Sequence, residues 1–467
     1  MHRAEFTDVP GTALVEALSY ISHASKRISS YSAVCRTWHL TLGEESAWRH
    51  LCKSYWYATE SRLKDWPSLS PKGLYHALEL WVPLEGFYVL APAFPWGLLV
   101  LVRITCGRVV ADVMRFLPRA SGDFIEINVP LFSVDLLEEE GNLRSCIEAL
   151  WALPGETRSL LMSSFDARLT RAHATGNQFF GREVIGSFFA QRKGLRLAAE
   201  EIAEPGDATP NIGASWEPGE LPKDPVTLLD HTQEMIRVMC GVARVPLDLM
   251  LVQSPADFVP QDSTQPRMRR GLYVGDYRHG MYGQYRTEVL LLDYVELSAR
   301  ELRQERQRPL RIFNRGPSTE YPAPQELQGL CDLDCGATFM RVVKQCGDVH
   351  VPMGATTFVA VCGPEPACSA ILHSIGEAPK HVENRQTGQW EEVRRAWGGF
   401  GTLARFGFSG PSWSRGWLAQ LPPHPETGDD RFGFVWSSAQ DAVVLSWVTA
   451  QDTSPFLQRQ WLPADLR

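Results

Sequence analysis

The sequence predicts an α+β protein with a three-helix module at the N-terminus, followed by an antiparallel β-barrel-like domain with helical insertions. Apolar residues recur every three or four positions over residues 9–51, which is the spacing of amphipathic helices. After residue 86 the chain breaks into short alternating or β-branched runs bounded by glycine and proline, which is typical of antiparallel strands. The strands follow one another without the intervening helices that a parallel sheet needs.

Composition narrows the class of protein. A chain of 467 residues, 44% apolar and 21% charged, is typical of two or three globular domains. The net charge of −8 argues against general nucleic-acid binding, which requires a basic surface. No apolar run reaches the roughly 18 residues of a membrane helix. Ten cysteines without paired CxxC spacing favour reduced thiols in the cytoplasm or nucleus.

The N-terminal helices carry more apolar surface than they can bury among themselves. Three short helices with some forty residues in total fall at the size below which a domain usually needs outside help, about 40 residues. We therefore expect another polypeptide to cover the surplus. The residues that we expect to contact it are Val9, Pro10, Leu14, Leu18, Ile21, Ile28, Val34, Cys35, Trp38 and Trp48.

This stretch resembles an F-box, the helical module that docks on the adaptor Skp1. The family pattern matches Val9-Pro10, Val34-Cys35-Arg36-Thr37-Trp38 and Trp48-Arg49-His50-Leu51. The resemblance implies that the residues named above contact Skp1. Residues 26–30 (KRISS) are more polar than is usual in the family, so docking is expected to be weakened. The alternative is an ordinary helical cap packed on its own chain.

The sequence pattern divides the chain into five segments. We expect an F-box at residues 6–55, a helical connector at 56–85, the first part of the β domain at 86–137, a helical and loop insertion at 138–260, and the rest of the β domain at 261–467. Within the insertion, the clearest predicted helices are residues 146–151, 195–202 and 226–241. Predicted strands of the last part are residues 271–277, 288–295, 337–343, 355–362, 401–408, 416–421, 431–437 and 442–448, with a polar insertion at 363–396.

The β region as a whole is similar to the F-box only proteins that serve as client receptors for D-type cyclin turnover. The similarity lies in residues 97–132, 271–289, 344–354 and 401–436. It implies a closed, barrel-like domain whose cavity takes the C-terminal end of a client chain. It also implies that the client contacts are Lys344, Gly347, Asp348, Tyr277 and His279.

The chemistry of these residues suits that role. A lysine ammonium is a compact charge for a terminal carboxylate, and the Gly347-Asp348 turn offers an acceptor for amide N–H groups. In the alternative interpretation, Lys344 is a solvated lysine at a strand end and Asp348 an ordinary turn former. Alternating Phe432, Phe434 and Trp436 are expected in the barrel core.

We expect neither a metal nor a cofactor nor an active site. Cys146 and His173 are two ligands short of a tetrahedral zinc site. Residues 399–404 match the letters of a dinucleotide fingerprint without its strand and helix. The sequence therefore predicts the receptor subunit of a Skp1–cullin–F-box ubiquitin ligase. Its expected partners are Skp1, the cullin–RING core and a client. A small-ligand barrel and an F-box scaffold outside a ligase are the alternatives.

Overall fold

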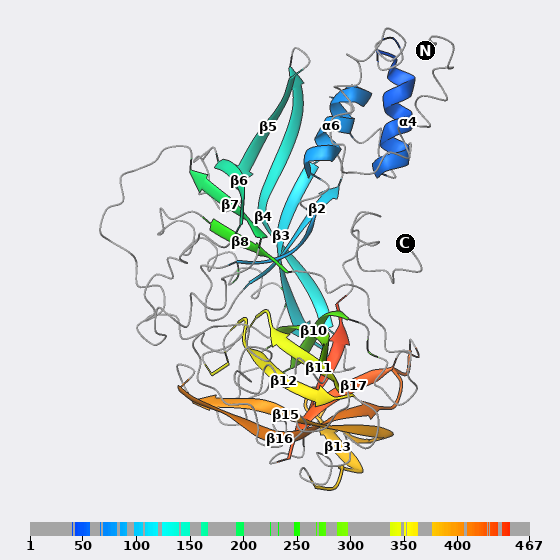
Figure 1. Ribbon diagram of the computed structural model, residues 1–467, viewed down its shortest axis with the longest axis vertical. Helices are drawn as coiled ribbons and strands as arrows, with labels where there is room; N and C mark the ends of the chain where they lie inside the picture. Colours follow the sequence, from blue (N-terminus) through cyan, green and yellow to red (C-terminus); the bar gives the residue numbers. More distant parts are fainter. Residues whose placement is uncertain are drawn as a thin grey trace, which may run out of the picture.

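A computed structural model describes the chain from Leu40 to Val448 with gaps (Figure 1). The described residues are 40, 43–56, 66, 69–81, 85–90, 98–105, 108–119, 124–139, 142–149, 160–166, 193–199, 225, 232, 247–252, 268, 270–276, 287–297, 337–346, 350–351, 353–362, 376–405, 409–426, 428, 430–437 and 441–448.

Two helices pack against each other at the N-terminal end of this part. Helix α4 covers Glu45–Trp56 and helix α6 covers Pro71–Trp81. Ser70 caps α6, because its Oγ accepts a hydrogen bond from the Gly73 N–H at 3.0 Å, and proline suits the first helical position. The helix predicted around Trp48 is present as α4, and α6 lies within the expected connector at 56–85, whereas the two preceding helices of the expected F-box fall outside the described residues.

The first sheet has eight antiparallel strands in the order β5-β4-β3-β2-β1-β8-β7-β6. Its two longest strands, β3 and β4, run from the helical end of the molecule towards the second sheet (Figure 1). The strands are β1 Gly86–Leu90, β2 Leu99–Thr105, β3 Arg108–Pro118, β4 Phe124–Glu139, β5 Asn142–Ala149, β6 Leu160–Asp166, β7 Lys193–Ala199 and β8 Leu247–Leu251.

The predicted helices at residues 146–151 and 195–202 are wrong. Strand β5 occupies 142–149 and pairs with β4, and β7 occupies 193–199 between β6 and β8. Cys146, Leu150 and Trp151 have helical spacing, and alanines follow Leu197, so local preference favours a helix there. Pairing with neighbouring strands overrides that preference. Of the helix predicted at residues 226–241, only Thr232 is described, and it is helical.

The second sheet closes into an antiparallel barrel of eight strands. Each of β9–β12 and β15–β18 pairs with its neighbours, and β9 also pairs with β18, so that this ring has no free edge. The strands are β9 Gly271–Asp276, β10 Thr287–Leu297, β11 Ala337–Lys344, β12 Thr356–Val361, β15 Arg395–Arg405, β16 Ser409–Leu421, β17 Arg431–Trp436 and β18 Asp441–Trp447. The predicted strands at 271–277 and 288–295 correspond to β9 and β10, which pair with each other.

A short hairpin lies within the segment that we expected to be a polar insertion. Strand β13 covers His381–Asn384 and β14 covers Trp390–Glu392. Strand β13 joins the barrel by parallel pairing to the first residues of β18, and β14 pairs with β13. The inward side chain of Val382 packs with apolar residues from the outer face of β16–β18.

The barrel interior is packed with side chains. Alternate residues of the barrel strands form one buried cluster rich in aromatic groups, with Phe358 stacked on Phe434 at 4.3 Å between ring centroids. Phe432, Phe434 and Trp436 belong to this cluster, as expected. Gly401 has to be glycine here, because a Cβ would lie 2.2 Å from Trp436 Nε1.

The outer face of the barrel packs on the first sheet. Leu272, Val274 and Val289 share a buried cluster with Phe87, Val89, Leu99, Leu101, Met114 and Phe116. Residues 86–137, which we expected to supply part of the barrel, lie instead in the separate sheet. Neither described helix is long and apolar enough to cross a membrane.

Candidate functional site

Lys344 is the last residue of β11, at the end where the chain continues towards β12. Its backbone N–H donates to the Ala355 carbonyl at 2.9 Å, and its carbonyl accepts from the Gly354 N–H at 2.6 Å. The next two residues fold back on β10, because the N–H groups of Gln345 and Cys346 both donate to the Val289 carbonyl. Backbone hydrogen bonds therefore fix the position of Lys344 from both neighbouring segments, residues 354–355 and β10.

The Lys344 side chain is buried and forms an ion pair with Glu288 of β10. Its Nζ lies 2.7 Å from Oε1 and 2.6 Å from Oε2, and both side chains are only 2% exposed. The register places Lys344 opposite Leu290, so Glu288 is the diagonal neighbour on the same face. That face is the barrel interior, since Leu290 and Leu292 belong to the interior cluster.

A thiol and a guanidinium lie where the barrel meets the first sheet. Burial raises the pKa of Cys346 from 9.0 to about 12, and the nearby Glu288 carboxylate adds to this rise. The Arg115 guanidinium and hydrogen bonds from the backbones of Leu99 and Val289 oppose the shift. Burial in turn lowers the pKa of Arg115, and Cys346 opposes that change.

The pKa of Cys346 decides its chemistry. A thiol with a pKa near 12 is protonated at neutral pH, and the thiolate is the nucleophilic form. Cys346 therefore acts here as a packed neutral group that contacts both sheets. Arg115 is the charged group beside it at the junction, and the Glu288 carboxylate acts on it from the barrel interior.

Of the client contacts expected from the sequence, only Lys344 belongs to the described part of the chain. Gly347, Asp348, Tyr277 and His279 fall outside it. Of the described residues beside these positions, Val351 and Met353 are buried in the inter-sheet cluster and Asp276 is buried, whereas His350 and Thr287 are partly exposed. Asp276 and Thr287 pair at the ends of β9 and β10 that adjoin residues 277–286.

Glu288 is the residue of this candidate site that the sequence analysis did not predict. It lies two residues before Leu290 on an alternating strand, so its carboxylate shares the interior face. An acidic residue on the same face of a strand as its buried apolar residues indicates a buried cationic partner. Lys344, already a predicted site residue, was the candidate for that partner. The interpretation of Lys344 as a solvated residue at a strand end does not fit its burial.

Trp48 is the one expected Skp1 contact that lies within the described residues, and it is buried in its own chain. Its ring lies 5.3 Å from that of Tyr75 in α6, and Lys72 Nζ lies 5.9 Å from its centroid. Ala47, Leu51 and Cys52 complete the buried face of α4. The other expected contacts, Val9, Pro10, Leu14, Leu18, Ile21, Ile28, Val34, Cys35 and Trp38, fall outside the described part.

The described residues contain no group of three histidine, cysteine, aspartate or glutamate side chains that could hold a metal ion. Neither a scan against protein-family models nor a search of curated protein sequences returned a match for this chain. The features that bear on function are therefore the closed barrel, the buried Lys344–Glu288 ion pair and the packed helices α4 and α6.

Proposed function

We propose that this chain is the substrate-recognition subunit of a Skp1–cullin–F-box ubiquitin ligase. The F-box at residues 6–55 carries the Skp1 contact, and Skp1 links the chain to the cullin–RING core. The β domain holds the client through its C-terminal end, free or modified, at the barrel mouth near Lys344. The complex works in the cytoplasm or nucleus. Catalysis consists of positioning, because a tethered client lysine meets the charged conjugating enzyme at a raised effective concentration.

The arrangement of α4 is the observation that supports this proposal most. Trp48 and Leu51, the ends of the Trp48-Arg49-His50-Leu51 motif, are buried, and α4 packs on α6. Helix α6 in turn contacts β5 of the first sheet. An adaptor bound to the preceding helices would be connected through packed elements to the β domain, as positioning requires. Trp48 would then hold α4 in place without touching Skp1.

The exposed face of α4 is polar. Glu45, Ser46, Arg49, His50 and Lys53 are exposed, and Glu45 pairs with Arg49 one turn later. Within residues 45–53, the part of α4 whose side chains the structure describes, no apolar side chain is exposed to an adaptor. The proposal therefore assigns the Skp1 contact to residues 9–38 and makes α4 its support.

Interior packing weighs against the alternative of a small-ligand barrel. A ligand-binding barrel needs interior space, whereas large side chains such as Phe358, Phe434 and Trp436 fill this one. The client would therefore bind at the end of the barrel near Lys344 and not in the barrel interior.

The adaptor assignment is tested by co-purification. We expect the wild-type chain to retain Skp1 and cullin, and the double variant Leu18→Ala/Trp38→Ala to lose both, because apolar burial drives docking. Arg49→Ala on the polar face of α4 is the matched control and should retain both. Equal recovery of Skp1 by the double variant contradicts the proposal, and Skp1 without cullin indicates a scaffold outside a ligase.

The client site needs a variant that spares the buried ion pair. Lys344→Glu would place two carboxylates together inside the barrel, so lost binding could simply reflect misfolding. We expect Asp348→Ala to abolish binding of peptides that end in a free or modified C-terminus, measured by fluorescence anisotropy. Glu377→Ala on the exposed surface is the control. Unchanged affinity of Asp348→Ala removes the client site from the barrel mouth.

A further inference from the structure

The β13–β14 hairpin has two faces of different chemistry. Val382 and Glu391 are paired across the strands and face the barrel, where Val382 is fully buried. The two neighbouring pairs therefore face outwards, because successive side chains alternate between faces. These outward residues are His381, Glu383, Trp390 and Glu392.

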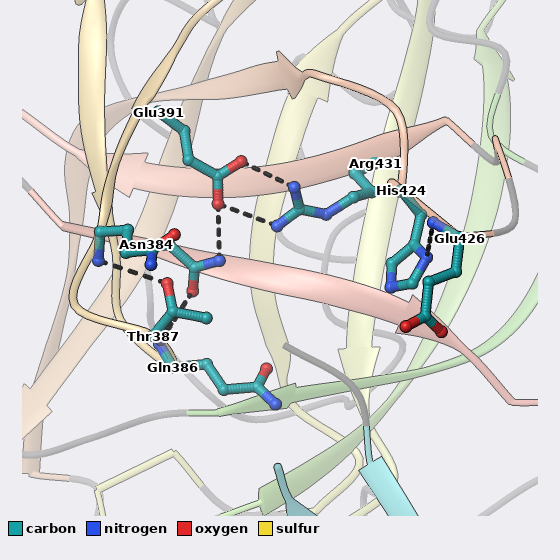
Figure 2. Close-up of polar contacts among 8 residues, drawn as sticks. Asn384, Gln386, Thr387, Glu391, His424, Glu426 and Arg431 are labelled. Atoms are coloured by element: carbon teal, nitrogen blue, oxygen red, sulfur yellow. Dashed lines mark hydrogen bonds and ion pairs between the residues drawn. The ribbon is translucent and has the colours of Figure 1, made fainter. Parts of the chain in front are cut away.

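The inward face fixes the hairpin to the barrel. Glu391 accepts two hydrogen bonds from Arg431 of β17, at 2.7 and 2.9 Å, and a third from Asn384 Nδ2 at 2.7 Å (Figure 2). The Asn384 Oδ1 accepts from the Gln386 N–H at 2.9 Å and so holds the turn. Gln386 Nε2 then donates to the Arg119 carbonyl beside β3. The outward face is therefore presented on a rigid support.

The outward face has an exposed indole between carboxylates. Trp390 is 57% exposed, one of the three large apolar side chains that are exposed in the described part of the chain. Glu383 lies directly opposite it, and Glu392 follows two residues later on the same strand. Neither carboxylate has an ion pair or hydrogen bond with any residue that the structure describes. An aromatic face beside unpaired negative charge suits a cationic group.

No strand that the structure describes pairs with the outer edge of β14. Strand β14 is the last of its sheet. Asn384 bonds with Gln389, and Val393 bonds with Lys380, so by alternation the pair Val382–Glu391 is hydrogen-bonded. The N–H and C=O groups of Trp390 and Glu392 then point away from β13. The open edge is short, since the Arg394 N–H already donates to Gln420.

We propose that this hairpin face binds an extended segment of a partner protein that carries arginine or lysine. The segment runs along the Trp390–Glu392 edge, and its cationic side chain lies over the Trp390 ring between Glu383 and Glu392. Charge complementarity selects the occupant, because the carboxylates repel acidic segments and leave neutral ones without an ion pair. This surface is separate from the barrel mouth and does not depend on the proposed ligase function.

The test uses the full chain and labelled peptides of defined composition, measured by fluorescence anisotropy. The basic peptide alternates arginine with valine, and the matched peptides carry glutamine or glutamate in place of arginine. We expect binding of the basic peptide only, weakened by added salt. Trp390→Ala should weaken it about tenfold through loss of the cation–π contact. Glu383→Gln/Glu392→Gln should weaken it about fivefold.

Two controls separate this surface from general charge effects. Glu377→Gln removes an exposed carboxylate that belongs to neither β13 nor β14, and Leu403→Ala removes another exposed apolar side chain. Both should bind the basic peptide as the wild type does. The proposal fails if Trp390→Ala binds as tightly as the wild type, or if the glutamate peptide binds equally well. Either result leaves Skp1 co-purification, the test of the ligase function, unchanged.

Discussion

The barrel interior and helix α4 each hold an ion pair of almost the same length. Lys344 and Glu288 are 2.6 Å apart in the barrel, and Arg49 and Glu45 are 2.7 Å apart on α4. Their surroundings differ, because the first pair is 2% exposed on both sides and the second is 48% and 62% exposed. Distance alone therefore does not predict what an ion pair contributes.

Solvent accounts for the difference. On α4, water solvates either partner when the other is removed, so the pair contributes little. In the barrel, removal of one partner leaves a charge in an apolar interior. The Arg431–Glu391 pair of the hairpin is intermediate, with exposures of 17% and 14%. The three pairs form a series in which the cost of breaking an ion pair should follow its burial.

The largest effect is expected at the barrel pair. Lys344→Met should destabilise the protein by about 3–5 kcal/mol, because it leaves the Glu288 carboxylate buried without a counter-charge. The measurement is the midpoint of thermal or urea unfolding. The double variant Lys344→Met/Glu288→Leu removes both charges and should recover most of the stability. A double variant as unstable as the single one would show that the pair itself stabilises the barrel.

A smaller effect is expected at the hairpin. Glu391→Gln keeps the shape of the side chain and removes the charge that holds Arg431, which should cost about 1–3 kcal/mol. Urea unfolding measures the loss. Glu426→Gln is the control, since Glu426 is exposed beside the same region. A loss as large as that of Lys344→Met would break the proposed dependence on burial.

The smallest effect is expected on α4. Glu45→Gln should change stability by less than about 0.5 kcal/mol, because exposed pairs four residues apart on a helix contribute little. The same unfolding measurement at low and high salt gives the screened part of this value. A loss above 1 kcal/mol would mean that Arg49 has a structural role beyond this pair.

Strand alternation was the part of the fold that the sequence could predict. The runs at 271–277 and 288–295 became β9 and β10, and Phe432, Phe434 and Trp436 entered the barrel core. Residues 142–149 and 193–199 were missed because their local pattern favours a helix, whereas their partners lie elsewhere in the chain. Closure of the ring by β9 and β18 has no local pattern at all.

The candidate site was predictable only residue by residue. Lys344 stood out beside a glycine turn, but its partner Glu288 is 56 residues away in the sequence, and pairing at that range depends on strand register. The Arg115–Cys346 junction was invisible for the same reason, because it joins two sheets. Trp390 was grouped with a polar insertion, since one exposed tryptophan in a short edge strand leaves no periodic pattern.

The pairing of β9 with β18 has a consequence for synthesis of the chain. The first barrel strand leaves the ribosome long before the last, and its partner on that side, Leu445 opposite Gly275, is among the final residues of the barrel to emerge. Until then the nascent chain carries two open strand edges, which other chains can extend. Completion of the barrel must therefore follow translation of β18.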